Sequence, residues 1–191
     1  MAQNKIKMKN SISYKEYCNS VSSFFEFLKK NNSIYDLNVK ALKVKKRNNF
    51  QLVPLSYLHL KDENIIKKLC EWRNKFSHTY YPNKKTTVFK TKIWIKKFVL
   101  KKKDKILFIV MKDGTIPVGH IGFANCFNRE LNFEIDNVIK GEKNLHPGLF
   151  SDVIQTLMDW ARTTFYLNDI TLKVLHVNKR AIKYYKKNNF K

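Results

Sequence analysis

The C-terminal segment, residues 169–190, constrains the fold of this chain more than any other feature. The run 169–176 has the pattern of a β-strand, and a helical pattern over 178–189 follows it with almost no linker. Ala181 and Tyr185 lie four residues apart and therefore share one face of this helix, which Asn178 precedes and Phe190 follows. A strand that leads directly into such a helix favours a mixed α/β fold.

The order of the remaining elements predicts a mostly antiparallel central sheet flanked by helices. Asp113-Gly114 is a type I′ turn signal between two strand-like runs. The core domain, residues 49–191, is expected to contain strands at 50–56, 105–112, 115–124 and 130–138, helices from residue 62, over 91–100 and after residue 148, and a polar link at 77–87.

The first 48 residues are predicted to form a separate accessory segment with one helix. Residues 1–12 are a polar start, and Ser13 and Glu16 have the spacing of a capping box at the beginning of a helix. Residues 31–48 are ambiguous, with a weak strand-like alternation between Ser33 and Val44.

Together, this element order and the C-terminal motif Asn178, Ala181, Tyr185 and Phe190 resemble the GNAT N-acetyltransferase superfamily over residues ~50–190. The resemblance implies an acetyl-CoA-dependent enzyme in which an amine attacks the thioester directly in a ternary complex. It implies that Tyr185 lies near the coenzyme A sulfur and protonates the departing thiolate, whereas Tyr184 should face elsewhere. Asn178 would contact the pantetheine arm or simply cap the helix.

A loop before the strongest helix is the expected site for the coenzyme A pyrophosphate. A helix N-terminus offers unpaired N–H groups and a partial positive charge. Here the chain departs from the tight glycine repeat of the family and looks like a variant form found in bacterial sugar-modifying members. Pro147 is expected in the first helical turn, and Gly148 would let the phosphate approach. The expected cofactor-binding residues are Val138, Ile139, Lys140, Gly141, Pro147, Gly148, Leu149, Phe150, Asn178 and Tyr185.

The strand 130–138 carries the candidate base. Alternation places Asn132, Glu134 and Asp136 on one face. By resemblance, Glu134 assists deprotonation of the amine, while Asp136 holds the substrate or serves instead through water. The backbone amides of 137–139 would polarise the thioester carbonyl where this strand diverges from its neighbour. A solvated face of a half-exposed sheet is the alternative.

The acceptor is expected to be a small amine, and a nucleotide-linked amino sugar is preferred by resemblance. Related sugar-acetylating members have a similar Trp-Arg-Asn near the acceptor, so Arg73 and Asn74 are candidate substrate contacts, with Trp72 in the core as the alternative. His120 and His176 lie near the presumed site, where a structural role is favoured over proton transfer. The five histidines share no ligand spacing, so no metal is predicted.

Composition limits the partners and the compartment. Lys and Arg number 38 against 15 Asp and Glu, a formal net charge of +23. The excess is almost all lysine and is spread along the chain, as AT-rich coding produces. No nucleic-acid-binding motif accompanies it, so no specific nucleic-acid partner is expected. No apolar run suits a membrane span or a signal peptide, and Cys18, Cys70 and Cys126 have no pairing pattern. A cytoplasmic protein with reduced thiols is therefore expected.

Typical members of the superfamily continue past the last helix with two more strands, and this sequence has no counterpart of them. The acceptor side is then expected to use residues 1–48 or a second subunit, which makes a homodimer possible. The alternative is a catalytically inactive or truncated GNAT-like binding module that associates with nucleic acid.

Overall fold

The computed structural model describes residues 13–31, 33–79 and 84–191. The expected polar start, residues 1–12, and part of the expected link, residues 80–83, lie outside the described residues. The helices are α2 (Tyr14–Lys29), α3 (Ile34–Val39), α4 (Glu63–Lys75), α5 (Val88–Ile95), α6 (Leu149–Phe165) and α7 (Lys179–Lys187). Short turns of helix are η1 (Tyr57–Leu60), η2 (Ser77–Thr79) and the π-helical η3 (Lys96–Leu100).

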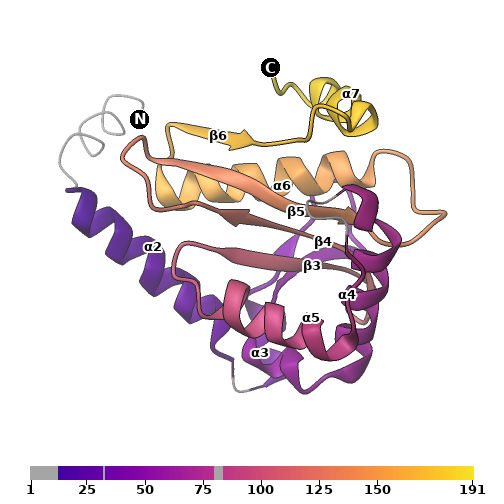
Figure 1. The fold of residues 1–191 in the computed structure, drawn as a ribbon. Helices are drawn as coiled ribbons and strands as arrows, with labels where there is room; N and C mark the ends of the chain where they lie inside the picture. Colours follow the sequence, from indigo (N-terminus) through magenta and orange to yellow (C-terminus); the bar gives the residue numbers. More distant parts are fainter. Residues whose placement is uncertain (1–12, 32, 80–83) are drawn as a thin grey trace.

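One six-stranded sheet runs through the molecule in the order β1-β2-β3-β4-β5-β6 (Figure 1). Its strands are β1 (Leu42–Lys43), β2 (Phe50–Pro54), β3 (Ile106–Lys112), β4 (Ile116–Ala124), β5 (Asn132–Lys140) and β6 (Asp169–Leu172). Neighbouring strands are antiparallel except for β5 and β6, which are parallel. The mixed α/β fold with a mostly antiparallel sheet is therefore confirmed.

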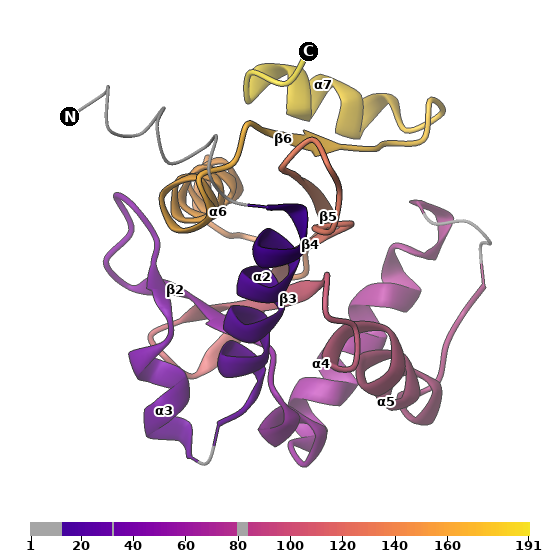
Figure 2. The same ribbon diagram turned by 90° about the vertical axis from the view of Figure 1, so that its left-hand side faces the viewer.

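Helices cover both faces of the sheet, and each face has its own apolar core. Figure 2 shows α6 on one side and the pair α4 and α5 on the other. The apolar residues of α2 and α6 pack together on the first face, around Phe25, Phe108 and Phe133. The apolar residues of α4 and α5 pack on the second face, around Trp72 and Ile109. Strand alternation supplies side chains to both cores.

The N-terminal segment contributes to this same sheet and core. The predicted helix is present as α2, and the capping box is confirmed, because Ser13 Oγ accepts from the Glu16 amide at 3.2 Å and the Glu16 carboxylate accepts from the Ser13 amide at 2.8 Å. The weak alternation after Ser33 is misleading, because half of that run forms the short helix α3, which Ser33 caps. Only β1 is extended, and it pairs with β2.

Tertiary pairing changes the length of several expected elements. Asp113 and Gly114 have φ of 49° and 73°, as the predicted type I′ turn requires. The strand expected over 169–176 ends at Leu172, where its pairing with β5 stops. The helix expected over 91–100 begins earlier, at Val88, because Thr87 caps it, and it ends in the π-helical turn η3.

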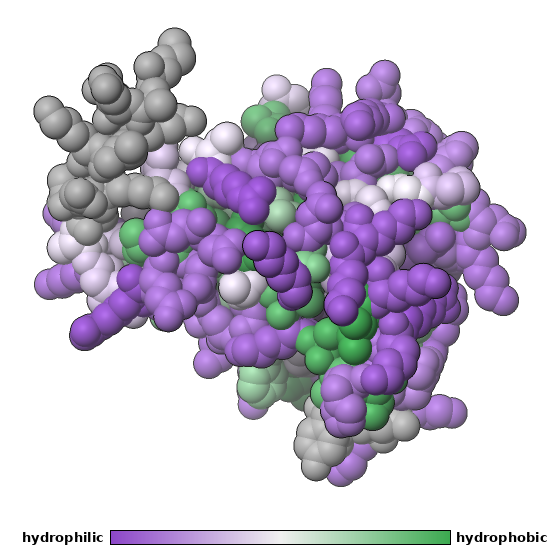
Figure 3. All heavy atoms as spheres, turned by 90° about the horizontal axis from the view of Figure 1, so that it is seen from above, coloured by the Kyte–Doolittle hydropathy of each residue, from purple (hydrophilic) through white to green (hydrophobic). Residues whose placement is uncertain are grey.

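The surface above α7 and β6 is mostly hydrophilic, with scattered apolar residues (Figure 3). Among the latter, Leu175 and Val177 follow β6 and are 42% and 66% exposed. Among the described residues, no helix combines the length and the apolar character that crossing a membrane requires.

Candidate active site at the divergence of β5 and β6

The pairing between β5 and β6 stops partway along β5. The paired residues run from Asn132 opposite Asp169 to Ile135 opposite Leu172, where β6 ends. From there β5 continues to Lys140 and stays paired with β4 alone. The expected divergence of the two strands is therefore confirmed. Residues 136–140 have no strand beside their outer edge in the described part of the chain.

β5 also carries a bulge within the stretch that is not paired with β6. Asn137 and Val138 together face the single residue Ile121 of β4, and Asn137 has a φ of 53°. The bulge resets the alternation, so Ile135 and Val138 both pack toward the α6 side of the sheet. The backbone amides of 137–139, predicted to polarise an acyl carbonyl, thus belong to a segment that is irregular and has no strand on its outer edge.

His120 of β4 holds the bulge from inside the protein. Its ring is fully buried, and Nδ1 lies 2.7 Å from the carbonyl oxygen of Asn137. A carbonyl only accepts hydrogen bonds, so Nδ1 carries the proton. Burial lowers the pKa of His120 to about 4, with the nearby Arg73 charge adding to the effect and Asp136 opposing it. The ring is therefore neutral at pH 7, and its Nε2 has no hydrogen-bond partner among the described residues.

We expect this buried imidazole to make the protein sensitive to mild acid. The pKa rises from about 4 in the folded state to about 6.5 on unfolding. Between these values the unfolded state binds more protons, so lowering the pH through this window favours unfolding. Above pH ~6.5, His120 does not lower the free energy of unfolding. By pH ~4 its protonation in the unfolded state lowers that free energy by an amount on the order of 3 kcal/mol.

The measurement is urea unfolding at pH 7 and pH 4.5 for the wild type and for His120→Asn. The asparagine amide can donate to the Asn137 carbonyl but does not titrate. The free energy of unfolding should therefore fall less steeply with acid in the variant. Equal slopes for the two proteins would assign the acid sensitivity to other groups.

The predicted phosphate loop starts at Gly141, which α4 holds in place. Lys75 Nζ donates to the Gly141 carbonyl at 2.7 Å. Trp72 Nε1–H donates to Glu142 Oε1 at 3.1 Å, and Lys68 Nζ lies 3.0 Å from the same oxygen. A Cβ added to Gly141 would come within 2.2 Å of the Trp72 ring. Packing against tryptophan, rather than backbone freedom, therefore requires glycine at position 141.

The loop ends at the N-terminus of α6. Gly148 is the N-cap and has a φ of 80°, which glycine adopts at little cost. The expectation that Pro147 occupies the first helical turn is wrong, because a residue with positive φ follows it and the helix begins only at Leu149. The side chains of Leu149 and Phe150 are buried in the core. They orient the helix, whose Leu149 and Ser151 amides donate to the carbonyls of His146 and Gly148, so an anion there would meet the Phe150 amide.

α7 carries the predicted Asn178 and Tyr185. Asn178 Oδ1 accepts from the Ala181 amide at 3.1 Å, so the capping alternative is confirmed. Tyr185 packs against Phe190, with ring centroids 5.9 Å apart. Burial, with smaller contributions from Tyr184 and Asp136, raises the pKa of Tyr185 to about 12. Its phenol therefore stays protonated at neutral pH. It is also close enough to Asp136, the first β5 residue beyond the divergence, for the Asp136 charge to affect its pKa.

Tyr184, which we expect to face elsewhere than Tyr185, contacts the first turn of α6. Its hydroxyl lies 3.4 Å from Ser151 Oγ in the first turn of α6, and its ring centroid is 5.5 Å from that of Tyr185. Both side chains also pack against the apolar core between α6 and the sheet.

Both candidate carboxylates are ion-paired. Glu134 lies within the part of β5 paired with β6, and its carboxylate accepts from Lys173 Nζ at 2.8 Å and from Asn125 Nδ2 at 2.9 Å. Asp136 lies just beyond the pairing, contacts Lys105 Nζ, and accepts from the Asn137 amide at 2.8 Å. The predicted alternation of this strand holds, since Phe133 and Ile135 pack into the opposite core.

The two predicted acceptor residues on α4 have different surroundings. The Arg73 guanidinium stacks on the ring of Trp94 at 3.9 Å and is close enough to affect the pKa of His120. Asn74 is tied to the segment before α5, exchanging hydrogen bonds with the backbone of Thr86 at 2.9 and 2.7 Å. Trp72 is buried, as its structural alternative required. Asn74 thus shapes the α4–α5 connection.

Three residues around the site had no sequence signal that singled them out. Lys105 pairs with Asp136, Lys75 holds Gly141, and Arg47 contacts the end of the loop. Lysine is so frequent in this chain that no single lysine stands out. Arg47 is conspicuous only as an arginine among lysines, which would have been the one available clue.

The comparisons with known proteins agree with this geometry. Residues 55–191 match the family model described as an acetyltransferase (GNAT) domain. Similar solved structures include the ribosomal L7/L12 alpha-N-protein acetyltransferase RimL (apo), with a TM-score of 0.64, 12% identity, and coverage of 78% of this chain and 80% of that one. A probable acetyltransferase of the GNAT family from Chromobacterium violaceum gives 0.60 and 15%, with coverage of 79% and 73%.

The spermidine N-acetyltransferase from Vibrio cholerae in complex with CoA and spermine gives a TM-score of 0.59 and 14% identity, covering 74% of this chain and 80% of that one. No curated protein sequence matches the chain. At these identities the structures establish the fold, and the family model establishes the family. The chain belongs to the GNAT acetyltransferase family, whose acyl donor is acetyl-CoA.

Proposed function

We propose that this N-acetyltransferase acts on a small amine and that the amine belongs to a nucleotide-linked amino sugar. The divergence of β5 from β6, with the bulge at Asn137, is the observation that carries the acyl-transfer proposal. It leaves β5 backbone with no strand on its outer edge, within which the Asn137 amide donates to Asp136. The variant loop ending in Pro147-Gly148 and the net positive charge favour an anionic sugar nucleotide as acceptor.

The residues divide the work of a direct transfer in a ternary complex. When bound, acetyl-CoA supplies the acetyl group as a thioester. The neutral amine attacks the carbonyl, so that a C–N bond forms and the C–S bond breaks. Of the amides expected for this role, those of Val138 and Ile139 stabilise the negative charge that develops on the carbonyl oxygen, because the Asn137 amide is held by Asp136. A β5 carboxylate takes the proton released by the amine through water, and Tyr185 interacts with the departing sulfur.

Of the two carboxylates, we place the base on Asp136 and leave Glu134 to orient Lys173. Asp136 is the first residue beyond the pairing with β6, and it influences the pKa of Tyr185. Asp136→Asn should lower kcat about 100-fold, whereas Glu134→Gln should change kcat less than tenfold. Steady-state kinetics from pH 5 to pH 9 test this assignment. A larger loss in Glu134→Gln would return the base to Glu134.

The acceptor is tested by measuring thiol release from acetyl-CoA with three kinds of amine. The panel should contain a nucleotide-linked amino sugar, a polyamine and a peptide with a free N-terminus, each at equal concentration. We expect the highest kcat/KM for the amino sugar nucleotide and a lower value for the same amino sugar without its nucleotide. A polyamine or peptide that outperforms both would replace the proposed acceptor.

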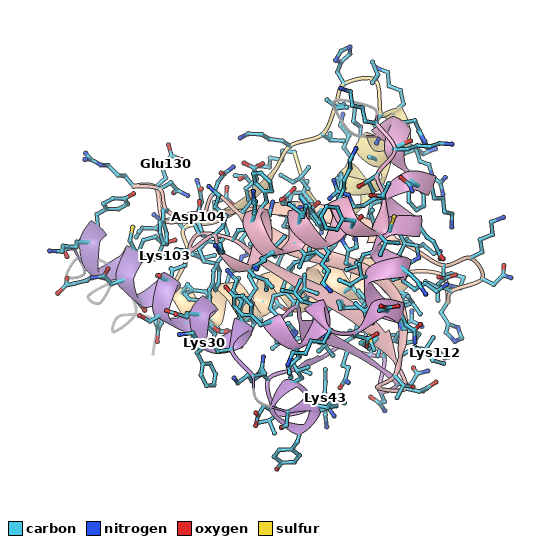
Figure 4. All side chains as sticks on the ribbon, turned by 60° about the horizontal axis from the view of Figure 1, so that its bottom comes forward. Lys30, Lys43, Lys103, Asp104, Lys112 and Glu130 are labelled. Atoms are coloured by element: carbon cyan, nitrogen blue, oxygen red, sulfur yellow. The ribbon has the colours of Figure 1, made fainter. Side chains whose placement is uncertain are left out.

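A second candidate function, a catalytically silent module that associates with nucleic acid, is favoured only by the net charge of +23. Figure 4 shows labelled lysines far apart, with Lys30 and Lys103 on one side and Lys112 on the other. A spread of this kind argues for a general positive field rather than one docking site. Calorimetric titration separates the two functions. Saturable acetyl-CoA binding favours the enzyme, and salt-sensitive DNA binding without acetyl-CoA binding favours the module.

We also propose that a second copy of the chain contributes to the acceptor side. β6 is an end strand of the sheet in the described part of the chain, and its outer edge is open to pairing. Light scattering at several protein concentrations tests for the dimer. The three free cysteines support a reducing compartment, so we place the activity in the cytoplasm.

A further inference from the structure

The turn between β1 and β2 is docked onto α6. Val44 is buried in the core, and the Lys45 amide donates to Thr156 Oγ1 at 3.0 Å in the middle of the helix. The turn is closed by hydrogen bonds from the Arg47 amide to the Val44 carbonyl and from the Phe50 amide to the Arg47 carbonyl, at 3.1 and 2.9 Å. The backbone of Arg47 is therefore fixed relative to the start of α6.

The Arg47 side chain spans the end of the phosphate loop. Nε donates to Asp152 Oδ2 at 2.7 Å, and Nη2 donates to the Pro147 carbonyl at 3.0 Å. The first contact is in the first turn of α6, and the second immediately precedes Gly148. One planar guanidinium thus binds the chain on both sides of Gly148, the N-cap residue with positive φ. A lysine, with a single ammonium, could not reproduce this fork.

The same contact improves the electrostatics of the loop. Asp152 puts a negative charge in the first turn of α6, where it would repel a phosphate. The Arg47 charge offsets it at 2.7 Å, and both side chains are about three-quarters buried, at 27% and 22% exposure. The guanidinium has five N–H groups, and two of them are engaged in these contacts.

We infer that Arg47 is a positioning residue for the phosphate end of acetyl-CoA. It lies outside residues 55–191, the part matched by the family model, and comes from the N-terminal segment. By holding the Pro147–Gly148 turn and neutralising Asp152, it favours phosphate binding at the start of α6. The Leu149 and Ser151 amides already donate to the carbonyls of His146 and Gly148, which leaves the Phe150 amide of this first turn for the phosphates. The inference rests on the proposed acetyl-CoA function. It adds to the phosphate site a residue that lies outside the loop itself.

The experiment compares acetyl-CoA with S-acetylpantetheine, which has the same thioester but no phosphate groups. In Arg47→Met, the KM for acetyl-CoA should rise about tenfold while kcat stays within about twofold, because the loss falls on phosphate binding. The kcat/KM for S-acetylpantetheine should not change. Arg47→Lys should recover only part of the loss in Arg47→Met, because lysine keeps the charge that offsets Asp152 but not the fork that holds the turn. An Arg47→Lys enzyme with wild-type KM would overturn the positioning role.

Lys45→Met is the matched control. Lys45 belongs to the same turn, and its side chain pairs with Asp159, farther along α6. Lys45→Met should therefore leave kcat/KM unchanged for both acetyl-CoA and S-acetylpantetheine. Equal losses with both donors in Arg47→Met, or an unchanged KM for acetyl-CoA, would overturn this inference alone, provided that the wild type is active. A wild type inactive with every donor and acceptor would overturn the proposed function as well.

Discussion

Replacing Tyr185 with phenylalanine is expected to lower kcat about 100-fold, the typical cost of removing one donor that acts on developing charge. The change deletes one hydroxyl and keeps the ring that packs against Phe190. Burial raises the pKa of Tyr185 to about 12, whereas a thiol ionises near ~8.5. Complete proton transfer to the thiolate is therefore uphill. Tyr185 is expected to stabilise the departing sulfur as a hydrogen-bond donor until solvent supplies the proton.

Tyr184→Phe is the matched control for this prediction. The Tyr184 hydroxyl makes a 3.4 Å contact with Ser151 Oγ, so its removal should change kcat less than Tyr185→Phe does. Acetyl-CoA affinity, measured by calorimetry, should stay within about twofold of the wild type in both variants, since the loss is confined to the transition state. Equal kcat losses in the two variants would show that the tyrosines act through the placement of α7. An unchanged kcat in Tyr185→Phe would remove its hydroxyl from the mechanism.

The elements that sequence predicted well are those set by local chemistry. The capping box at Ser13, the type I′ turn at Asp113-Gly114 and the cap at Asn178 each need only a few neighbouring residues. The end of β6 is different, because residues 173–176 keep a strand-like pattern but have no partner strand to pair with. The length of a strand depends on how far the neighbouring strand runs beside it, and the pattern of a single sequence does not show that pairing.

In the candidate site, too, local sequence patterns predicted some features, and other features depend on the folded sheet. Alternation along β5 predicted the shared face of Glu134 and Asp136, and the helix pattern predicted where α6 would follow the loop. The bulge at Asn137 reverses that alternation, and asparagine's tolerance of positive φ was its only local sign. The ion pairs of the two carboxylates join residues 31 and 39 positions apart, so only the folded sheet reveals them.

Replacing Trp72 with alanine is expected to reduce the free energy of unfolding by about 3–5 kcal/mol, the range for a fully buried aromatic residue. Trp72 is 2% exposed, packs directly under Gly141, and lies beside His120 at 6.0 Å between ring centroids. The substitution leaves a cavity beneath the start of the phosphate loop. It also removes the hydrogen bond that Trp72 donates to Glu142. Urea unfolding measures the loss, and calorimetry on the folded variant should show weaker acetyl-CoA binding.

Two further variants separate packing from hydrogen bonding at this position. Trp72→Phe keeps an aromatic ring but not the Nε1–H, so it should cost about 1 kcal/mol from the lost hydrogen bond, in addition to the smaller volume. Trp94→Ala removes a half-buried tryptophan that stacks on Arg73 at the surface, and should cost less than Trp72→Ala. If Trp72→Ala lost no more stability than Trp94→Ala, the ring could not be what holds Gly141. The loop would then be able to move away from the Trp72 ring, which a Cβ at position 141 would otherwise approach to 2.2 Å, and Gly141→Ala would be tolerated.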